Sequence, residues 1–234
     1  MIASINQPAY LPWLGYFQRI AVSDVHVVLD HVQFEKNSFT NRNKVRTSNG
    51  WNWLTVPVWT KGHFGDSAIN RLAIDNSGLW AKKHWATLRQ SYARAPYFRK
   101  YEDFFEQVYG SPWDGLADLC GALTTYLLDA FGITTQLVFS SELDPQGTKD
   151  ELVLDLCQKV GADQYLSGAL GRNYLRESLF EEAGISVSYQ DYFHPTYPQV
   201  YSPFEPYMAA IDLLFNCGPR SLELLMTAPG GTHP

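Results

Sequence analysis

Residues 1–29 alternate between strand-like and helix-like patterns, and this alternation limits the fold more than any other feature of the chain. Residues 1–5 (MIASI) and 25–29 (VHVVL) are short apolar runs that are typical of buried strands. Between them, residues 14–22 place their leucine, phenylalanine, alanine and valine side chains on one helical face. A strand, a helix and a second strand within ~30 residues predict a βαβ unit with a right-handed parallel crossover.

The same alternation returns after Thr134. We expect strands at residues 136–140, 164–167 and 185–189, and helices at 148–160 and 173–183. The run from Thr148 to Glu151 matches a capping box, which marks the start of the first of these helices. Strands that alternate with helices predict an α/β fold with a mostly parallel, Rossmann-like sheet.

The middle of the chain follows a different pattern. Residues 53–59 and 69–75 have the composition of strands, although Pro57 limits the first of them to an edge or a bulge. Residues 80–94, 97–109 and 113–131 predict three helices, the last of which ends at Gly132. We therefore expect one domain over residues 1–226 with a helical insertion at about 80–131, and a disordered tail at 227–234.

Composition limits the classes of partner. The 234-residue chain has a formal net charge of −6 at pH 7, which gives no general attraction to nucleic acid or to an anionic membrane. We expect neither DNA nor a membrane as a partner, while a tRNA substrate and the oligomeric state stay open. The three cysteines lack metal-ligand spacing, so no metal site is predicted and a reduced, cytoplasmic protein is favoured. No signal-like segment is present, and no apolar run approaches ~18 residues.

Three clusters of polar and aromatic residues follow predicted strands. They are an opening loop stiffened by Pro8 and Pro12, with Gln7, Tyr10, Gly15 and Tyr16; a second cluster of Asp30, Gln33, Lys36, Asn41, Arg42, Asn43 and Lys44; and a glycine-rich loop with Ser167, Gly168 and Arg172. Because loops at the carboxyl ends of parallel strands converge on one crevice, we expect these residues to share a binding site. Each cluster also has a structural interpretation, as an aromatic turn, an Asn-rich loop that satisfies its own backbone, or a plain strand-to-helix turn.

The basic residues of these clusters suit an anionic substrate. Arg42 carries a planar guanidinium fork between two asparagines, which suits bidentate recognition of a phosphate or carboxylate. The backbone N–H groups of the loop after Ser167 can cradle an anion, and Arg172 adds charge there. We expect Arg42, Lys44 and Arg172 to bind phosphate.

Asp30 and His84 are the candidates for catalysis. A carboxylate beside an imidazole would orient the ring and act with it as a general base that deprotonates an amine. The alternative for His84 is packing between Trp80 and Trp85 inside the predicted helices. No Ser-His-Asp order, HExxH, Walker A or GxGxxG motif occurs, which excludes most standard catalysts.

Several of these runs occur together in one known family. QPAYLPWLGYF, LDHVQFEKNSFTNRNKV, WLTVPV, the helix with Trp80 and His84, ADQYLSGALGRNYL and DLLFNCGP resemble the WbqC-like family over residues 7–219. The family usually has two aspartates before Val-Gln-Phe, whereas this chain has Asp30 and His31. A role that needs two adjacent carboxylates is therefore not expected.

The resemblance implies a role in O-antigen or related surface-polysaccharide biosynthesis. It implies a transferase that forms an amide between an amino acid or acyl group and a nucleotide-linked amino sugar, either as an acyl or aminoacyl transferase or as an ATP-dependent amide ligase. ATP-activated amino acid, aminoacyl-tRNA and acyl-CoA stay open as donors, and ATP or another nucleotide as the cofactor. The alternative is a non-catalytic protein that binds a nucleotide sugar or a biosynthetic partner.

A second likeness concerns the fold alone. An early strand, a turn that ends in Gly-aromatic at a helix start, and a late Ser-Gly loop resemble the nucleotidyltransferase-like (HUP) layout of adenylate-forming ligases. There the turn carries HxGH, and here residues 13–16 read WLGY, so both histidines that would hold ATP phosphates are absent.

Overall fold

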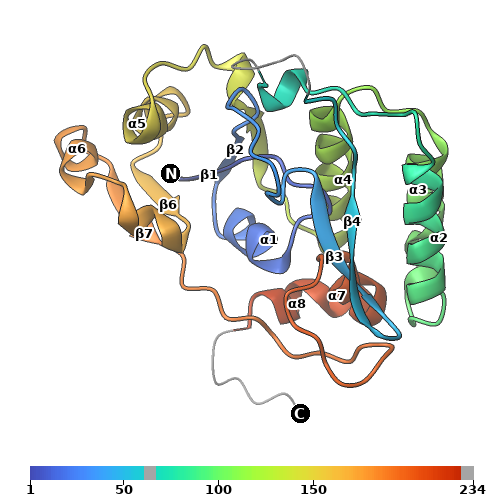
Figure 1. Cartoon of the computed structure of the whole chain (residues 1–234). Coiled ribbons are helices and arrows are strands. Elements are labelled where there is room, and N and C mark those ends of the chain that lie inside the picture. The colour runs from blue at the N-terminus through green and yellow to red at the C-terminus, as the bar shows by residue number, and fades with distance from the viewer. Residues whose placement is uncertain (61–66, 228–234) are drawn as a thin grey trace.

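The computed structural model describes residues 1–60 and 67–227. Its centre is a five-stranded sheet in which every strand pair is parallel. In spatial order the strands are β5 (Gln136–Phe139), β2 (Val25–Val28), β1 (Ile2–Asn6), β6 (Gln164–Ser167) and β7 (Ser186–Tyr189) (Figure 1). The predicted Rossmann-like parallel sheet is confirmed. The tail expected to be disordered lies outside the described residues, apart from Thr227.

The strand order changes direction once. From β1 the chain passes to β2 and then β5 on one side, and it returns to β6 and β7 on the other side of β1. The two directions meet between β1 and β6, which is the topological switch point of the sheet. In open parallel sheets, ligands bind outside the strand carboxyl ends at this point.

Helices cover both faces of the sheet. Alternate side chains of β1 and β2, including Ala3, Ile5 and Val27, pack with α5 (Lys149–Lys159) and α6 (Glu177–Glu182). Figure 1 shows α5 and α6 on the opposite side of the sheet from α1 (Leu14–Ala21) and α4 (Leu116–Phe131). On the α1 face, β1 and β2 present Ser4 and His26 instead of apolar side chains. A polar layer therefore lies between α1 and the sheet.

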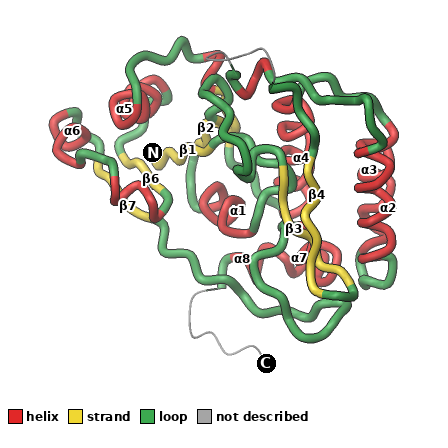
Figure 2. The backbone as a smooth tube through the Cα atoms, viewed as in Figure 1, coloured by secondary structure: helices red, strands yellow, loops and turns green. Residues whose placement is uncertain are grey.

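The three helices predicted in the middle of the chain are confirmed as α2 (Trp80–Tyr92), α3 (Phe98–Gly110) and α4. Gly132 follows α4 with a left-handed φ of 77°, as a helix C-terminus requires. These helices share one core with α7 (Ile211–Cys217) and α8 (Ser221–Leu225) (Figure 2). Phe215 is the centre of this core, with ring centroids 5.2 Å from Phe98 and 5.3 Å from Phe105.

Residues 42–55 differ from the prediction. They form an antiparallel hairpin of β3 (Arg42–Thr47) and β4 (Gly50–Thr55), in which Lys44 pairs with Trp53. The sequence predicted a strand at 53–59 and no strand within residues 42–47. Asn, Arg, Lys and Thr side chains resemble a loop locally, but one face of β3 is buried against the core through Val45.

Two other elements differ from the prediction. Residues 69–75 do not form a strand but a 3₁₀ turn at Ile69–Arg71, followed by isolated bridges from Ala73 and Ile74. The helix expected at 173–183 is shorter, because a 3₁₀ segment occupies Ala169–Asn173 and α6 begins at Glu177. In both places the backbone conformation depends on contacts with residues far away in the sequence. The local spacing of apolar residues does not predict such contacts.

A buried carboxyl group connects α7 to the segment that precedes it. Asp212 accepts hydrogen bonds from the hydroxyl of Tyr197 at 2.9 Å and the amide of Gln199 at 2.7 Å. Burial raises the pKa of Asp212 to about 6, because the charged form is poorly solvated there. The folded state therefore favours the protonated carboxyl group more than the unfolded state does.

We predict that Asp212 makes stability fall as the pH rises from about 4 to about 6. A carboxyl group with a raised folded-state pKa binds a proton more tightly in the folded chain, so this contribution is present at low pH and is lost above the folded pKa. Replacing Asp212 with Asn should remove the effect, which amounts to about 3 kcal/mol for a shift of about two pKa units. Urea unfolding of wild type and Asp212→Asn at pH 4 and pH 7 measures it. The same pair of measurements on Asp103→Asn, at an exposed position of α3, serves as the control; an Asp212→Asn difference that does not change with pH would contradict the prediction.

Candidate functional site

Arg19 occupies the switch point of the sheet. It belongs to the last turn of α1, and its side chain extends to the end of β1, where it donates to Oδ1 of Asn6 at 2.6 Å. On the other side it reaches the end of β6, because a Cβ placed on Gly168 would lie 2.6 Å from its Nη1 atom. One guanidinium group thus bridges the two strands between which the sheet reverses direction.

This guanidinium is a buried charge without a carboxylate partner among the described residues. Arg19 is 7% exposed, and burial lowers its pKa. The titratable groups that act on its pKa are tyrosines (Tyr16, Tyr165 and Tyr174) rather than acids, and burial keeps these hydroxyls neutral by raising their own pKa values. Buried cations are normally paired, so an unpaired one at a ligand-binding edge suits an anionic ligand.

The polar layer around Arg19 is only partly satisfied. His26 is hydrogen-bonded to the hydroxyl of Ser4 at 2.8 Å, and burial lowers its pKa to about 3, so its ring is neutral. Buried polar atoms without a hydrogen-bond partner include Arg19 Nε, Asn6 Nδ2, Tyr16 Oη and His26 Nε2. Unsatisfied buried donors are costly and are uncommon in folded proteins. Their concentration beside the switch point makes this layer a candidate site.

The loop after β6 needs its glycines for close packing. A Cβ on Gly168 would meet Arg19, and a Cβ on Gly171 would lie 2.1 Å from the hydroxyl oxygen of Ser167. The loop then continues as a 3₁₀ segment, in which Arg172 places its guanidinium 4.2 Å from the ring centroid of Tyr189. The sequence-predicted residues Ser167 and Gly168 therefore lie at the switch point, and Arg172 lies beside the next strand.

Asp30 lies at the carboxyl ends of β2 and β5, on the other side of β1. Its Oδ1 accepts from the Ser140 hydroxyl and the Ser141 backbone N–H, both at 2.9 Å, and its Oδ2 accepts from the Ser141 hydroxyl at 2.6 Å. His31 is joined to the same Ser140 hydroxyl at 2.6 Å. The structure thus fixes the Asp30 carboxylate in one orientation.

The Asp30 carboxylate lines a cavity of about 370 Å³. Asp118 and Glu142, both exposed, line the same cavity, together with Asn70 and the ring of Phe139. The cavity opens beside α4, on the sheet face that α1 also covers. The carboxyl edge of the sheet therefore carries a cationic group at β1 and β6 and an acidic cavity at β2 and β5.

Comparison with known proteins identifies the family. A sequence model of the WbqC-like protein family matches residues 7–224. The chain belongs to this family. It is also similar to the "Uncharacterized protein Rv1507c" of Mycobacterium tuberculosis, with 36% identity over 224 residues that cover 95% of this chain and 96% of the relative. No solved structure matches the chain.

His84 of this WbqC-like chain contacts the opening loop. A hydrogen bond of 2.8 Å joins its Nδ1 to the hydroxyl of Tyr10, which is bonded in turn to the hydroxyl of Tyr109 at 2.6 Å. Burial lowers the pKa of His84 to about 4, so the ring is neutral at pH 7. The ring also packs against Trp80, as the alternative interpretation expected. The hydrogen bonds described for Asp30 and His84 have no residue in common, and their pairing in one site stays a prediction.

The rest of the opening loop is closely packed in this WbqC-like fold. Tyr10 and Tyr16 are fully or almost fully buried, and the Tyr16 ring lies 5.5 Å from that of His26. A Cβ on Gly15 would lie 3.0 Å from the ring of Tyr192, so this glycine allows a close approach. Gln7 accepts a long hydrogen bond from Thr40 at 3.5 Å. Tyr16 is thus the loop residue that joins the polar layer of the switch point.

The second predicted cluster is divided between two places. Asp30 lines the acidic cavity, while Arg42 and Lys44 lie on the β3–β4 hairpin with their side chains over Trp53 and Trp51. The amide groups of Asn41 and Asn43 donate to the backbone carbonyls of Val56 and Leu11, both outside this segment, so these two bonds connect it to other parts of the chain instead of satisfying its own backbone. Gln33 and Lys36 are both exposed.

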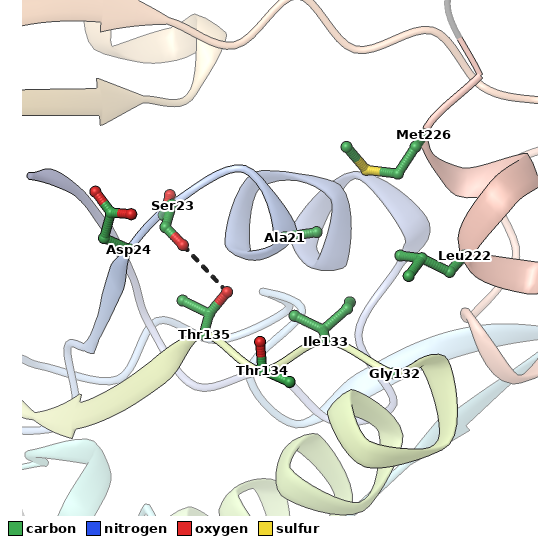
Figure 3. Close-up of a pocket in the computed structure, with 9 residues that line it drawn as sticks. All are labelled: Ala21, Ser23, Asp24, Gly132, Ile133, Thr134, Thr135, Leu222 and Met226. Carbon is green, nitrogen blue, oxygen red and sulfur yellow. Dashed lines mark hydrogen bonds between the residues drawn. The ribbon is translucent and has the colours of Figure 1, made fainter.

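The cavities described do not all lie at the carboxyl edge. One cavity of about 370 Å³ is lined by residues that precede β2 and β5, among them Asp24 and Thr135 (Figure 3). Figure 3 shows Thr135 bonded to Ser23, to whose backbone carbonyl its hydroxyl donates at 3.1 Å. This is the amino-terminal edge of the sheet, where parallel α/β folds do not place ligands. Within the described residues, no group of histidine, cysteine or acidic side chains could hold a metal ion, and no helix is long and apolar enough to cross a membrane.

Sequence analysis missed Arg19, Asn6, Ser140 and Ser141. Arg19 looks like an ordinary basic residue in the last turn of a helix, and nothing local indicates its burial. Asn6 ends the first strand and precedes Gln7, so its position at a strand carboxyl end was an available signal. The two serines follow β5 directly, and the same rule that selected Asp30 would have selected them.

We predict that Gly168→Ala destabilises the fold by pushing Arg19 away from β6. Close contact with the guanidinium should cost about 1–3 kcal/mol, which is usual for an overpacked buried site. The cost should shrink when Arg19→Ala is also present, because the clash is then removed. A double-mutant cycle by chemical unfolding measures this coupling. Gly78→Ala, where a Cβ meets nothing within 4 Å, is the matched control, and additive effects of the two site substitutions would refute the close contact.

Proposed function

We propose that the protein is a transferase of surface-polysaccharide or related amino-sugar biosynthesis, which forms an amide on a nucleotide-linked amino sugar. The observation that carries this proposal is the charge pattern along the carboxyl edge of the sheet. A buried guanidinium (Arg19) lies at the switch point, and an acidic cavity with Asp30 lies beside β2 and β5. A nucleotide-linked amino sugar carries the matching charges, a diphosphate and an ammonium group.

Arg19 is the residue we assign to the diphosphate. A guanidinium offers a planar fork of N–H donors that fits phosphate oxygens, and burial makes its interaction with an anion stronger than at the surface. The adjacent loop from Gly168 adds backbone N–H groups, and Arg172 follows in the same loop, with its guanidinium over Tyr189 of β7. The two unpartnered donors Arg19 Nε and Asn6 Nδ2 support the same assignment.

Asp30 is the residue we assign to the amine. Only β1 lies between β2 and β6, so these two strands are two inter-strand spacings, or roughly 10 Å, apart, a span that a sugar diphosphate can bridge. An ammonium group in the cavity would be attracted by Asp30, Asp118 and Glu142. An amine must lose a proton before its nitrogen attacks an acyl carbon, and a carboxylate at this position can accept it. In this proposal His84 holds the Tyr10 side chain in place and takes no part in proton transfer, because its Nδ1 is already hydrogen-bonded to the Tyr10 hydroxyl.

The acyl donor follows from the same chemistry. The attacking nitrogen forms the new C–N bond, and the bond from the acyl carbon to its activating group breaks. An ATP-activated amino acid, an aminoacyl-tRNA and an acyl-CoA each supply such a bond. The run WLGY at residues 13–16 has no histidine to hold ATP phosphates, which supports a donor that arrives already activated.

A non-catalytic binding protein is the second candidate. Three hydrogen bonds from Ser140 and Ser141 use both oxygens of the Asp30 carboxylate and fix its orientation, which suits a group that recognises an amine without reacting with it. In that case the same edge would recognise a nucleotide amino sugar without changing it. The transferase and the binding protein would recognise the same ligand, but only the transferase would form an amide. Mass spectrometry for an amide product therefore distinguishes the two functions.

We predict that Arg19→Met abolishes diphosphate binding while the fold is retained. The variant keeps an apolar stem of similar length and removes the unpaired charge, so its thermal stability should equal or exceed that of wild type. UDP-glucosamine at ~100 times its dissociation constant should stabilise wild type by about 2.7 kcal/mol and should not stabilise the variant. Arg99→Met, at a side chain 76% exposed, is the control and should behave as wild type. Equal stabilisation of wild type and Arg19→Met would remove Arg19 from the site.

We also predict that the free amine is recognised. Wild type should bind UDP-glucosamine about fivefold more tightly than UDP-N-acetylglucosamine, which corresponds to one favourable charge interaction of about 1 kcal/mol. Asp30→Asn should lose this preference and retain binding of the diphosphate. Isothermal titration of both sugars to both proteins measures it. A preference that survives in Asp30→Asn would show that another group recognises the amine.

A further inference from the structure

The β3–β4 hairpin carries a row of exposed aromatic rings on its outer face. Trp51, Trp53 and Phe39 are 42%, 38% and 42% exposed. The ring centroids of Trp51 and Trp53 lie 6.0 Å apart, those of Trp53 and Phe39 5.9 Å, and those of Phe39 and Trp13 5.1 Å. The row therefore continues without a gap from the hairpin to the start of α1.

Two cations lie over these rings. The guanidinium carbon of Arg42 is 4.4 Å from the ring centroid of Trp53, and Nζ of Lys44 is 5.0 Å from that of Trp51. Arg42 donates to Asn37, and neither cation forms an ion pair within the described part of the chain. We call this set of residues the hairpin ladder: Phe39, Arg42, Lys44, Trp51 and Trp53.

The surrounding sequence has the opposite charge to the rest of the protein. Residues 36–65 contain five lysines and arginines and no aspartate or glutamate, although the whole chain has a formal net charge of −6. The expectation that nucleic acid is not attracted rested on this overall charge, which hides the local one. A basic segment with interleaved aromatics is an electrostatic footprint of its own.

Core packing does not require these rings. The opposite face of the hairpin packs through Val45 and Leu54, which are 0% and 3% exposed, so the hairpin is already anchored. The register pairs Lys44 with Trp53, which puts this lysine and the indole on the same outer face. Arg46, which pairs with Trp51, is 1% exposed and donates to backbone carbonyls, so it is not part of that face. Large aromatic rings gathered on an exposed face usually mark a binding surface.

We propose that the hairpin ladder binds a single-stranded polynucleotide. Bases of any sequence stack on exposed aromatic rings, while lysine and arginine side chains beside the rings hold the phosphates. The ladder supplies both groups in alternation, and its freedom from carboxylates suits a polyanion. This inference goes beyond the proposed function, because none of its residues belongs to the switch point or to the acidic cavity.

An uncharged oligosaccharide is the competing occupant. Sugar rings also stack on tryptophan, but a neutral sugar would gain nothing from Arg42, Lys44 and the absence of acids in residues 36–65. The two occupants therefore differ in their response to salt. Polynucleotide binding should weaken as salt rises, with a slope of log affinity against log salt of about −0.7 for each phosphate contact.

The test is fluorescence anisotropy with labelled RNA and DNA octamers of the same mixed sequence, in a salt series. Wild type should bind with a salt slope of about −1.4, from the two phosphate contacts of Arg42 and Lys44. Trp53→Ala should weaken binding about tenfold, the loss of one stacked base. Lys44→Gln should reduce the slope by about 0.7. Tighter binding of the RNA octamer would show that the protein recognises the 2′-hydroxyl. Equal binding of the RNA and DNA octamers supports stacking on the bases alone.

Trp59→Ala is the matched control. Trp59 is 50% exposed and has no ring contact with the ladder among those described, so its loss should leave octamer affinity unchanged. Trp51→Ala provides a second ladder variant if Trp53→Ala does not fold. Arg19→Met should bind the octamers as wild type does, so a failure here is distinguishable from a failure of the proposed transferase. Absence of octamer binding, an equal loss in Trp59→Ala, or full competition by a neutral dextran oligosaccharide would overturn the proposal.

Discussion

The contact of Arg19 with the ends of β1 and β6 is the constraint on which the candidate site depends. A guanidinium is placed between two parallel strands at the point where the sheet reverses, and its one described hydrogen bond goes to Asn6. Gly168 leaves the space for it. Because no carboxylate neutralises this charge among the described residues, the fold keeps an unpaired cationic group at the edge where α/β sheets bind ligands.

The residues around Arg19 are arranged so that its charge stays buried. α1 covers the polar layer of Ser4 and His26, and the neutral ring of His26 adds no second positive charge beside Arg19. Beyond β1, Asp30 follows β2 and the two serines follow β5. Ser140 and Ser141 hold the Asp30 carboxylate at the wall of the acidic cavity. Opposite charges are thus separated along one edge of the sheet instead of neutralising each other. This separation is the feature that a ligand with both a phosphate and an amine would use.

Local patterns predicted the parts of the fold that depend on local periodicity. The strands of the parallel sheet and the helices α2, α3 and α4 are apolar at regular spacing. Asp30 was selected as a candidate because it follows a strand. The β3–β4 hairpin was missed because its polar residues have the composition of a loop. Only the burial of Val45 against helices far away in the sequence distinguishes it as a strand. Arg19 was missed for a similar reason: its burial depends on Gly168 and Asn6, which come from other strands. Long-range contacts of this kind leave no periodic signal in the sequence.

The most direct measurement of the central claim is a crystal structure with UDP-glucosamine bound. The diphosphate is expected within hydrogen-bond distance, about 3 Å, of the Arg19 guanidinium, with the loop of Gly168 against it and the amine directed toward Asp30. A diphosphate bound elsewhere, with Arg19 still held by Asn6 alone, would contradict the assignment of the switch point as the ligand site.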